Sequence, residues 1–426
     1  MQWNSGQHLR RKKTVGTRPG SVCRRRGVMA DKIPEGWREC RLGEVAEIVK
    51  DKYQPKKGDA LIYIGLEHIQ EQTLRLNSIG SSEDIASDKF YFRKGDVLFG
   101  KLRPYFRKVV QVDFDGVCST DIWVIRPKAG VNQKYLLYLF ANKELVDLSN
   151  FSESGTRMPR ADWNFMSQTI WNIPIDQSEQ HAIASVLSSL DDKIDLLNRE
   201  NQTLEQMAEA IFRQWFIEEA DEKWEEVPLS EVFDFKEGPG IRNWQYRDNG
   251  IPFINIRLIS NGEIDVSKAN FVSEAEANAK YKHFYLQRKD MVVSTSGTLG
   301  KVAIIRNYHL PLLLNTSVIR FRPKDGINFS FMYGYLRSNE FYECLIDSAS
   351  GSVQLNFGPI HLKQIVMKIP PNEKLEYFRK VVDPIYEKFE LNYNQIRTLE
   401  KLRDTLLPKL MSGEVRVKLT DSEVQK

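Results

Sequence analysis

The sequence lacks the features that mark secreted, membrane-spanning or zinc-binding proteins. Its 426 residues include four cysteines, which stand far apart and form no Cys-x-x-Cys pair. This spacing argues against a disulfide framework or a zinc site and fits a reducing compartment. No apolar run is long enough to cross a bilayer. We therefore expect a cytoplasmic protein that does not bind a membrane.

Catalytic signatures are missing as well. The segment SGTLGKV at 296–302 is similar to a phosphate-binding loop, but the required upstream glycine is absent and Lys301 is not followed by Ser or Thr. There is no Asn/Asp-Pro-Pro-aromatic tetrapeptide of the amino-methyltransferase kind, and the six histidines have no metal-ligand spacing. The sequence therefore predicts a chain that is not an enzyme and holds no cofactor or metal of its own.

Positive charge is concentrated at the beginning of the chain. The formal net charge is +4, but residues 1–28 hold eight Lys/Arg and no Asp/Glu. Without them, 53 of the 61 Lys/Arg remain against 57 Asp/Glu, a net charge of −4. The leader has no apolar core for a signal peptide. It is either a nucleic-acid-binding arm or a disordered extension translated upstream of a start at Met29.

The chain contains an internal repeat. KFYFRKGDVLF at 89–99 aligns with HFYLQRKDMVV at 283–293, and WVIRPKAGVN at 123–132 aligns with IRFRPKDGIN at 319–328. The offset stays near 194 to 196 over most of the match. Short β-rich runs between Gly, Asn and Asp turns indicate that each half contains a mixed α/β (α+β) unit. A duplicated fold suggests a duplicated task.

A long helix is expected after each unit. Apolar residues recur with steps of four and three across 183–215 and 378–410, which is typical of a coiled-coil seam. Asn201 and Asn392 each interrupt a seam. If the helices pair antiparallel, these two amides face each other and set the register; a solvated seam position is the alternative. Two ordinary amphipathic helices, each packed on its own unit, remain the other interpretation.

The first long helix has a composition suited to protein partners. Between 178 and 218 it carries eight Asp/Glu against three Lys/Arg, so we do not expect it to lie against phosphate. Its outer face near the end is aromatic. We therefore expect partner docking by Phe212, Trp215 and Phe216.

Basic residues interleaved with aromatic ones recur at the same place in both halves. Residues 89–108 carry seven Lys/Arg and six aromatics, and 282–306 carry five Lys/Arg. Such segments suit phosphate and groove contacts, although many such residues are simply surface or core. The Ser-Gly loops SESGTRMPR and SASGSVQLN follow, and their polar side chains can reach base edges. The candidate DNA-binding residues are Lys94, Lys101, Arg103, Arg107, Arg157, Arg160, Arg288, Lys289, Thr298, Lys301, Gln354 and Asn356.

Together these features resemble the specificity subunit of type I restriction-modification systems. The resemblance covers residues 32–412 and is carried by IPEGWRECRLGEVAEI, GDVLFGKLRPYFRKVV, DFDGVCST and the segment IPIDQSEQHAIASVLSSLDDKIDLLNRENQTLEQMAEAIFRQWF. In the second half, IPFINIRLIS, SGTLGKVAI and LRDTLLPKLMSGEV match more loosely. SGSVQLNFGPI and SGTRMPRADW depart from the family's usual Gly-Thr-Thr-Gln-Pro loop.

The resemblance implies two target-recognition domains separated by an antiparallel pair of long helices. Each domain would read one half of a bipartite, asymmetric site in double-stranded DNA, and the helices would set the spacing. Methyltransferase subunits would dock on the assembly, and a restriction (motor-nuclease) subunit would complete it. S-adenosylmethionine, ATP and magnesium would belong to those partners. The target sequence and the spacer length are not readable from these residues.

The expected organisation has six parts, and two other functions remain open. The parts are a basic leader at 1–31, recognition domain 1 at 32–175, the central helix at 176–218, recognition domain 2 at 219–371, the C-terminal helix at 372–412 and a tail at 413–426. A stand-alone DNA-modifying enzyme would transfer methyl groups by itself. A coiled-coil scaffold would not bind one DNA sequence in a salt-dependent manner.

Overall fold

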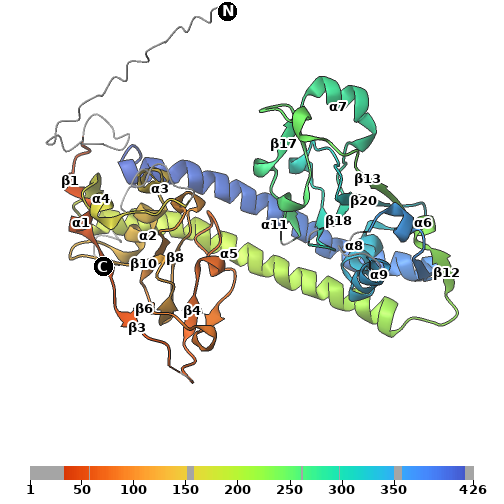
Figure 1. Ribbon diagram of the computed structural model, residues 1–426, viewed down its shortest axis with the longest axis horizontal. Helices are drawn as coiled ribbons and strands as arrows, with labels where there is room; N and C mark the ends of the chain where they lie inside the picture. The colour runs from red at the N-terminus through yellow and green to blue at the C-terminus, as the bar shows by residue number, and fades with distance from the viewer. Residues whose placement is uncertain are drawn as a thin grey trace, which may run out of the picture. The chain divides into compact units, whose positions relative to one another are not determined.

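The computed structural model describes residues 33–56, 58–150, 158–260, 262–296, 298–349 and 357–417, with only the backbone of Asp84, Ser348 and Ala349. The chain divides into two compact units. Unit 1 comprises residues 1–194 and 398–426, and unit 2 comprises residues 195–397. Both units mix helices and short strands, as expected from the repeat (Figure 1).

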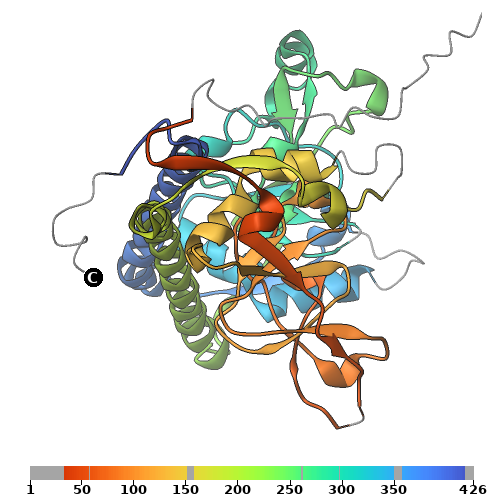
Figure 2. The ribbon, with the colours of Figure 1, turned by 90° about the vertical axis from the view of Figure 1, so that its left-hand side faces the viewer.

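Unit 1 is built on a four-stranded antiparallel sheet in the order β2-β10-β7-β8. A five-stranded sheet has the order β3-β6-β9-β4-β5, in which β4 and β9 run parallel, and β1 pairs with β11. Figure 2 turns this unit toward the viewer. The strands are β1 (Trp37–Arg41), β2 (Ala46–Val49), β3 (Lys52–Tyr53), β4 (Ile62–Ile64), β5 (Gly80–Ser81), β6 (Lys89–Phe92), β7 (Val97–Gly100), β8 (Val109–Gln111), β9 (Gly116–Cys118), β10 (Ile122–Pro127) and β11 (Ile170–Pro174).

Side-chain alternation along these strands separates two cores. Val97 and Phe99 of β7 join the core beneath the helices of unit 1, whereas Leu98 joins the core shared with the five-stranded sheet. Because successive strand residues point to opposite faces, a sheet covered on both faces needs an unbroken apolar run. The helices are α1 (Leu42–Val45), α2 (Gln133–Ala141), α3 (Lys143–Asn150), α4 (Trp163–Met166) and the beginning of α5 (Gln177–Arg213).

Unit 2 repeats the four-stranded sheet and the separate strand pair of unit 1. Its four-stranded sheet has the order β13-β20-β18-β19, β12 pairs with β21, and two further pairs are β14-β17 and β15-β16. The strands are β12 (Glu225–Pro228), β13 (Phe233–Glu237), β14 (Ile251–Phe253), β15 (Ile259–Ser260), β16 (Glu263–Ile264), β17 (Asn270–Val272), β18 (Met291–Ser294), β19 (Val302–Ile304), β20 (Val318–Pro323) and β21 (Val366–Ile369). The helices are α6 (Leu229–Val232), α7 (Glu274–Lys280), α8 (Phe329–Arg337), α9 (Asn339–Ala349), α10 (Pro359–Leu362) and the beginning of α11 (Asn372–Ser412).

The repeated sequence motifs have a structural explanation. In unit 1, the guanidinium of Arg126 donates two hydrogen bonds to the buried carboxylate of Asp96, at 2.7 and 2.8 Å. In unit 2, Arg322 binds the buried Asp290 through the same two nitrogens. A guanidinium and a carboxylate joined by two hydrogen bonds fix each other's orientation as well as neutralising each other's charge. The shared Arg-Pro-Lys and the shared Asp therefore record a common internal ion pair, which we call the sheet clamp.

The two long helices pack together inside each unit. In unit 1, Ile183 and Leu187 near the beginning of α5 share a core with Leu407 and Leu410 near the end of α11. In unit 2, residues near the end of α5 share a core with Phe378 and other residues near the beginning of α11. The local pairing is therefore antiparallel. Neither helix contains an internal Gly, and α5 closes with a π-helical turn at Gln214–Glu218.

The outward placement expected for Phe212 and Phe216 is wrong. Both rings are buried, with 2% and 7% of their surface exposed, and they pack on Phe331 of α8 and Phe378 of α11. A Cβ at Gly334 of α8 would overlap the Phe212 ring, so this glycine makes the close approach possible. The aromatic end of α5 is core because α8 covers it, a contact that helical periodicity alone does not reveal.

Candidate nucleic-acid interface

One end of the four-stranded sheet gathers several of the predicted contacts in unit 1. Strand β10 runs antiparallel to both β2 and β7, so β2 and β7 end where β10 begins. Lys101 and Arg103 follow β7 at this end. We call this edge, with the corresponding edge of the sheet in unit 2, the loop end.

The segment 159–161 pairs with this loop in unit 1. The backbone N–H of Arg103 donates to the carbonyl of Pro159, and that of Ala161 donates to the carbonyl of Lys101, both at 2.8 Å. Arg160 therefore lies beside them, and its guanidinium is 3.4 Å from the carboxylate of Asp121. The backbone pairing fixes three predicted cationic side chains, those of Lys101, Arg103 and Arg160, in one region.

The corresponding loop end of unit 2 has a different chemistry. Thr298 is exposed, and its carbonyl accepts a hydrogen bond from the hydroxyl of Ser294. The ammonium of Lys301 turns inward and donates to the carbonyl of Ile259 at 3.3 Å. The N–H of Phe357 donates to the carbonyl of Thr295, so the segment that closes the Ser-Gly loop meets this end too. The two units therefore offer different side chains on equivalent scaffolds.

Three predicted residues lie at the opposite end of the sheets. Lys94 stands in the turn before β7, and Arg288 and Lys289 stand in the turn before β18. All three residues are exposed, and the ammonium of Lys289 lies 5.2 Å from the centre of the Phe329 ring. The sequence suggested that the basic residues of 89–108 form one surface. Strand β7 divides this stretch, so its two parts lie at opposite ends of the sheet and do not form one surface.

Arg107 faces the interior of unit 1. Its guanidinium donates to the carbonyl of Ala141 at 2.8 Å, and burial lowers its pKa against the opposing influence of Asp404. The side chain thus closes the end of α2 and approaches α11. Arg107 therefore uses one of its donors within the fold, and a contact between Arg107 and DNA stays a prediction. Arg157, Gln354 and Asn356 lie outside the described residues.

Sequence reasoning missed a large exposed aromatic residue in unit 2. Trp244 has 73% of its surface exposed and stands in a short 3-10 turn at Asn243–Gln245. Arg242 and Arg247 flank it and are also exposed. The signal was present in GPGIRNWQYRD, where a tryptophan and two arginines occur in a glycine-rich connection.

The described residues contain no grouping suited to catalysis by a metal or a thiolate. No cluster of His, Cys, Asp and Glu in this part of the chain has a metal-binding arrangement. Burial raises the pKa of Cys40 to about 11 and that of Cys118 to about 12, so both thiols stay protonated and unreactive at neutral pH. Within the described ranges, no helix has the length and apolarity that a bilayer crossing requires.

A family model for the type I restriction modification DNA specificity domain matches the chain twice, at residues 34–206 and 221–401. The two matches cover most of the sequence and coincide with the two copies of the fold. The chain belongs to this family. Its role is DNA recognition within a type I restriction-modification system, a role that supplies sequence specificity and not catalysis.

Curated members of the specificity family resemble the chain over most of its length. The specificity subunit of the HindI enzyme from Haemophilus influenzae is 25% identical over 89% of this chain and 99% of its own. The specificity subunit of the MjaIX enzyme from Methanocaldococcus jannaschii is 28% identical over 69% of this chain and 71% of its own. The crystal structure of a type I system S subunit from M. genitalium is similar in fold, with a TM-score of 0.51 at 16% identity, covering 92% of this chain and 98% of that one.

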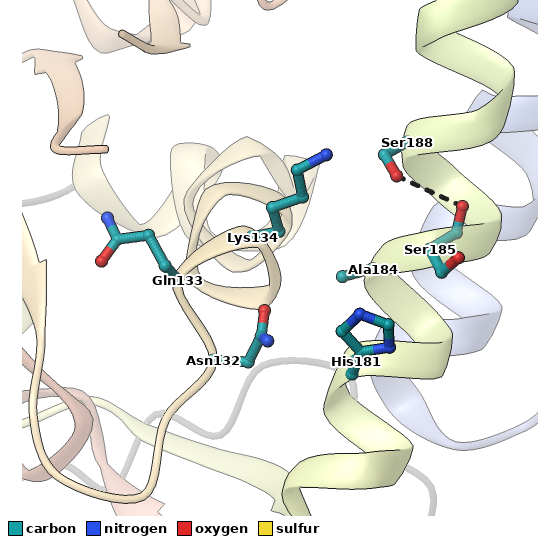
Figure 3. A pocket seen from close by; sticks show the side chains of 7 residues that line it. All are labelled: Asn132, Gln133, Lys134, His181, Ala184, Ser185 and Ser188. Atoms are coloured by element: carbon teal, nitrogen blue, oxygen red, sulfur yellow. Dashed lines mark hydrogen bonds between the residues drawn. The ribbon is translucent and has the colours of Figure 1, made fainter. Parts of the chain in front are cut away.

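The first specificity domain also carries a shallow pocket beside α5. It has a volume of about 250 Å³ and lies between the beginning of α2 and the first turns of α5 (Figure 3). Lys134 extends toward Ser188 across the opening, and His181 stands below on the same face of α5. The lining holds no pair of groups arranged for acid-base work. It is a recess on the helix that is lined mostly by polar residues.

Proposed function

We propose that each unit reads one half of a bipartite, asymmetric site in double-stranded DNA. The observation that carries this proposal is the repetition of one scaffold with different side chains at its loop end. The strand order of the four-stranded sheet and the sheet clamp are the same in both units. At the loop end, unit 1 presents Arg103 and Arg160, whereas unit 2 presents Thr298. Equivalent scaffolds with different side chains suit two different half-sites.

The long helices act as a spacer in this proposal. Helix α5 has 37 residues and α11 has 41, so each measures roughly 55–60 Å at 1.5 Å per residue. Both belong in part to each unit. An antiparallel coiled coil of this length would set the gap between the half-sites, with Asn201 and Asn392 specifying the register. The proposed domain boundaries at 175–176, 218–219 and 371–372 separate the units that read DNA from the helices that set the spacing.

Methyltransferase subunits and a restriction subunit are the proposed protein partners. They would carry S-adenosylmethionine, ATP and magnesium, and the assembly would work in the cytoplasm. Because Phe212 and Phe216 are buried, the proposed docking residues in unit 2 are Trp215 and Tyr377. Their rings stack at 5.2 Å, and Tyr377 has 61% of its surface exposed. The pocket beside α5 in unit 1 is a second proposed docking point.

Exchange of one unit tests the proposal. Residues 32–175 are replaced by the first unit of a family member with a different target, and the methylated sites of the host genome are mapped. We expect one half of the target to change while the other half and the gap remain. Exchange of residues 219–371 is the reciprocal control and should change the other half. A change in both halves after either exchange would contradict independent reading.

A further inference from the structure

Trp244 is exposed to a degree that folding alone does not explain. Of its surface, 73% is accessible, although an indole is among the side chains that gain most from burial. Aromatic residues and arginine are enriched at surfaces that bind a partner. The residue stands in the connection between β13 and β14 of unit 2.

The turn that carries Trp244 is held rigidly. The side chain of Gln245, which is buried, accepts a hydrogen bond from the N–H of Arg242 at 2.9 Å and donates to Glu276 and to Tyr281, each at 2.6 Å. On the other side, the N–H of Arg247 donates to the carbonyl of Phe271 at 2.9 Å. A residue fixed in this way loses little conformational entropy when it binds.

The turn arises from the loop end of unit 2. Strand β13 ends where β18 ends and where β20 begins, because β20 is antiparallel to both. The N–H of Ile241 donates at 2.8 Å to the side chain of Asn315, which lies just before β20. The N–H of Thr295, after β18, donates to the carbonyl of Ser317. Trp244 is therefore attached to the edge where Thr298 also lies.

The charge around Trp244 selects among partners. Arg242 and Arg247 flank it, and the guanidinium of Arg247 donates to the carbonyls of Trp244 and Tyr246, which keeps its charge at the turn. Among the described residues, neither guanidinium is held by a carboxylate. Two available cations beside an exposed ring fit a polyanion that also offers apolar surface, which describes the DNA groove with its sugars and bases.

We propose that Trp244 is a specificity-determining DNA contact of unit 2, with Arg242 and Arg247 binding the adjacent phosphates. This proposal rests on the proposed function. Trp244 enters a groove or a base step of the half-site read by unit 2, and the rigid turn sets its position. This contact adds a further determinant of that half-site, because Trp244 lies in a connection outside the Ser-Gly loop and the basic strand-turn segments.

The test uses the complex that the full chain forms with its partners and a duplex that carries the target mapped for the wild type. Failure of the wild-type complex to prefer any sequence would refute the proposed function and is scored before any variant. Trp244→Ala should then weaken binding of the target at least about tenfold, as for an anchoring aromatic residue. Trp244→Phe should keep part of the affinity. Val366→Ala, at another exposed apolar residue of unit 2, is the matched control and should bind as the wild type does.

Two further measurements separate a contact from a structural role. Bound target should protect tryptophan emission from acrylamide in the wild type, and Trp244→Phe should lack that protection. Base changes in the half-site read by unit 2 should lower the DNA affinity of Trp244→Ala less than that of the wild type. Base changes in the other half-site should lower the affinity of both proteins equally. Unchanged affinity and half-site preference in Trp244→Ala would overturn the proposal. Loss of partner assembly with DNA binding intact would also overturn it and would point to a protein contact.

Discussion

The amide nitrogen of Asn392 donates to the amide oxygen of Asn201 over 2.9 Å, between two side chains that are 1% and 3% exposed. The same nitrogen also donates to the carboxylate of Glu200 at 3.0 Å. The two long helices thus bury a polar pair where they pack together in unit 2. A buried polar pair of this kind favours one register over its neighbours, at some expense of stability.

Removal of one amide should therefore change register more than stability. Asn201→Leu leaves Asn392 hydrogen-bonded to Glu200. We therefore expect the free energy of unfolding, measured by thermal unfolding, to fall by about 1 kcal/mol or less. The looser register should broaden the distance distribution between spin labels at Gln202 and Leu391. The double variant Asn201→Leu, Asn392→Leu removes both polar groups and should be at least as stable as the wild type. A double variant less stable than the single one would show that the amide pair stabilises the fold.

The sheet clamp should be important for stability. Asp290→Ala leaves the guanidinium of Arg322 without its two acceptors, and the cost should be about 2–3 kcal/mol because Arg322 keeps partial access to water. Glu376→Ala, which breaks the exposed pair with Arg379, is the control and should leave stability nearly unchanged, because water screens an exposed ion pair. Denaturant unfolding of both variants checks this. Equal effects would refute a special role for the clamp.

Unit 2 should lose stability in mild acid through His309. Burial, followed by the charges of Arg306 and Arg397, lowers the pKa of this histidine from 6.5 to about 3. The unfolded chain therefore binds more protons between about pH 6.5 and pH 3, and stability falls as the pH falls through that window. The neighbouring Glu263, whose pKa burial raises, acts in the opposite sense.

A variant isolates the contribution of His309. Its Nδ1 accepts a hydrogen bond from the N–H of Arg306 at 3.0 Å, which the amide oxygen of His309→Gln can replace. Between about pH 8 and pH 5, the melting temperature of the wild type should fall more than that of His309→Gln. Parallel curves would show that other groups control the acid response.

Two neighbouring arginines should behave differently in DNA binding. Arg103→Ala at the loop end should lower the slope of log affinity against log salt by about 1, as expected for one lost phosphate contact. Arg107→Ala should keep the slope and lose about 1.5–3 kcal/mol of stability, because it leaves the carbonyl of Ala141 without its charged donor. A reduced slope in Arg107→Ala would contradict its inward assignment.

The spacer hypothesis predicts a longer gap for a longer helix. Insertion of four residues after Arg199 adds about one turn, roughly 5–6 Å, to α5, which corresponds to one or two base-pair steps of about 3.4 Å. The mapped target should keep both half-sites and widen between them. Because four residues disturb the four-three phase of the apolar contacts, some stability should be lost. A variant that assembles and still methylates sites with the original gap would refute the spacer.

The sequence alone determined the repeat, the mixed α/β units and the two long helices. These features depend on local periodicity and on motifs such as Arg-Pro-Lys, which survive in both copies because the clamp they form is internal. The sequence offered Asn201 opposite Asn392 as one of two interpretations, and the hydrogen bond between them comes from the structure.

Only the tertiary structure decided which side chains face outward. Phe212 and Phe216 are on a helical face that looks free until α8 covers it, and Arg107 is cationic in sequence but bonded to a helix end in space. Lys94 and Lys101 stand seven residues apart in one basic stretch, yet β7 places them at opposite ends of a sheet. Exposure depends on contacts between segments far apart in the chain, and neither periodicity nor composition encodes those contacts.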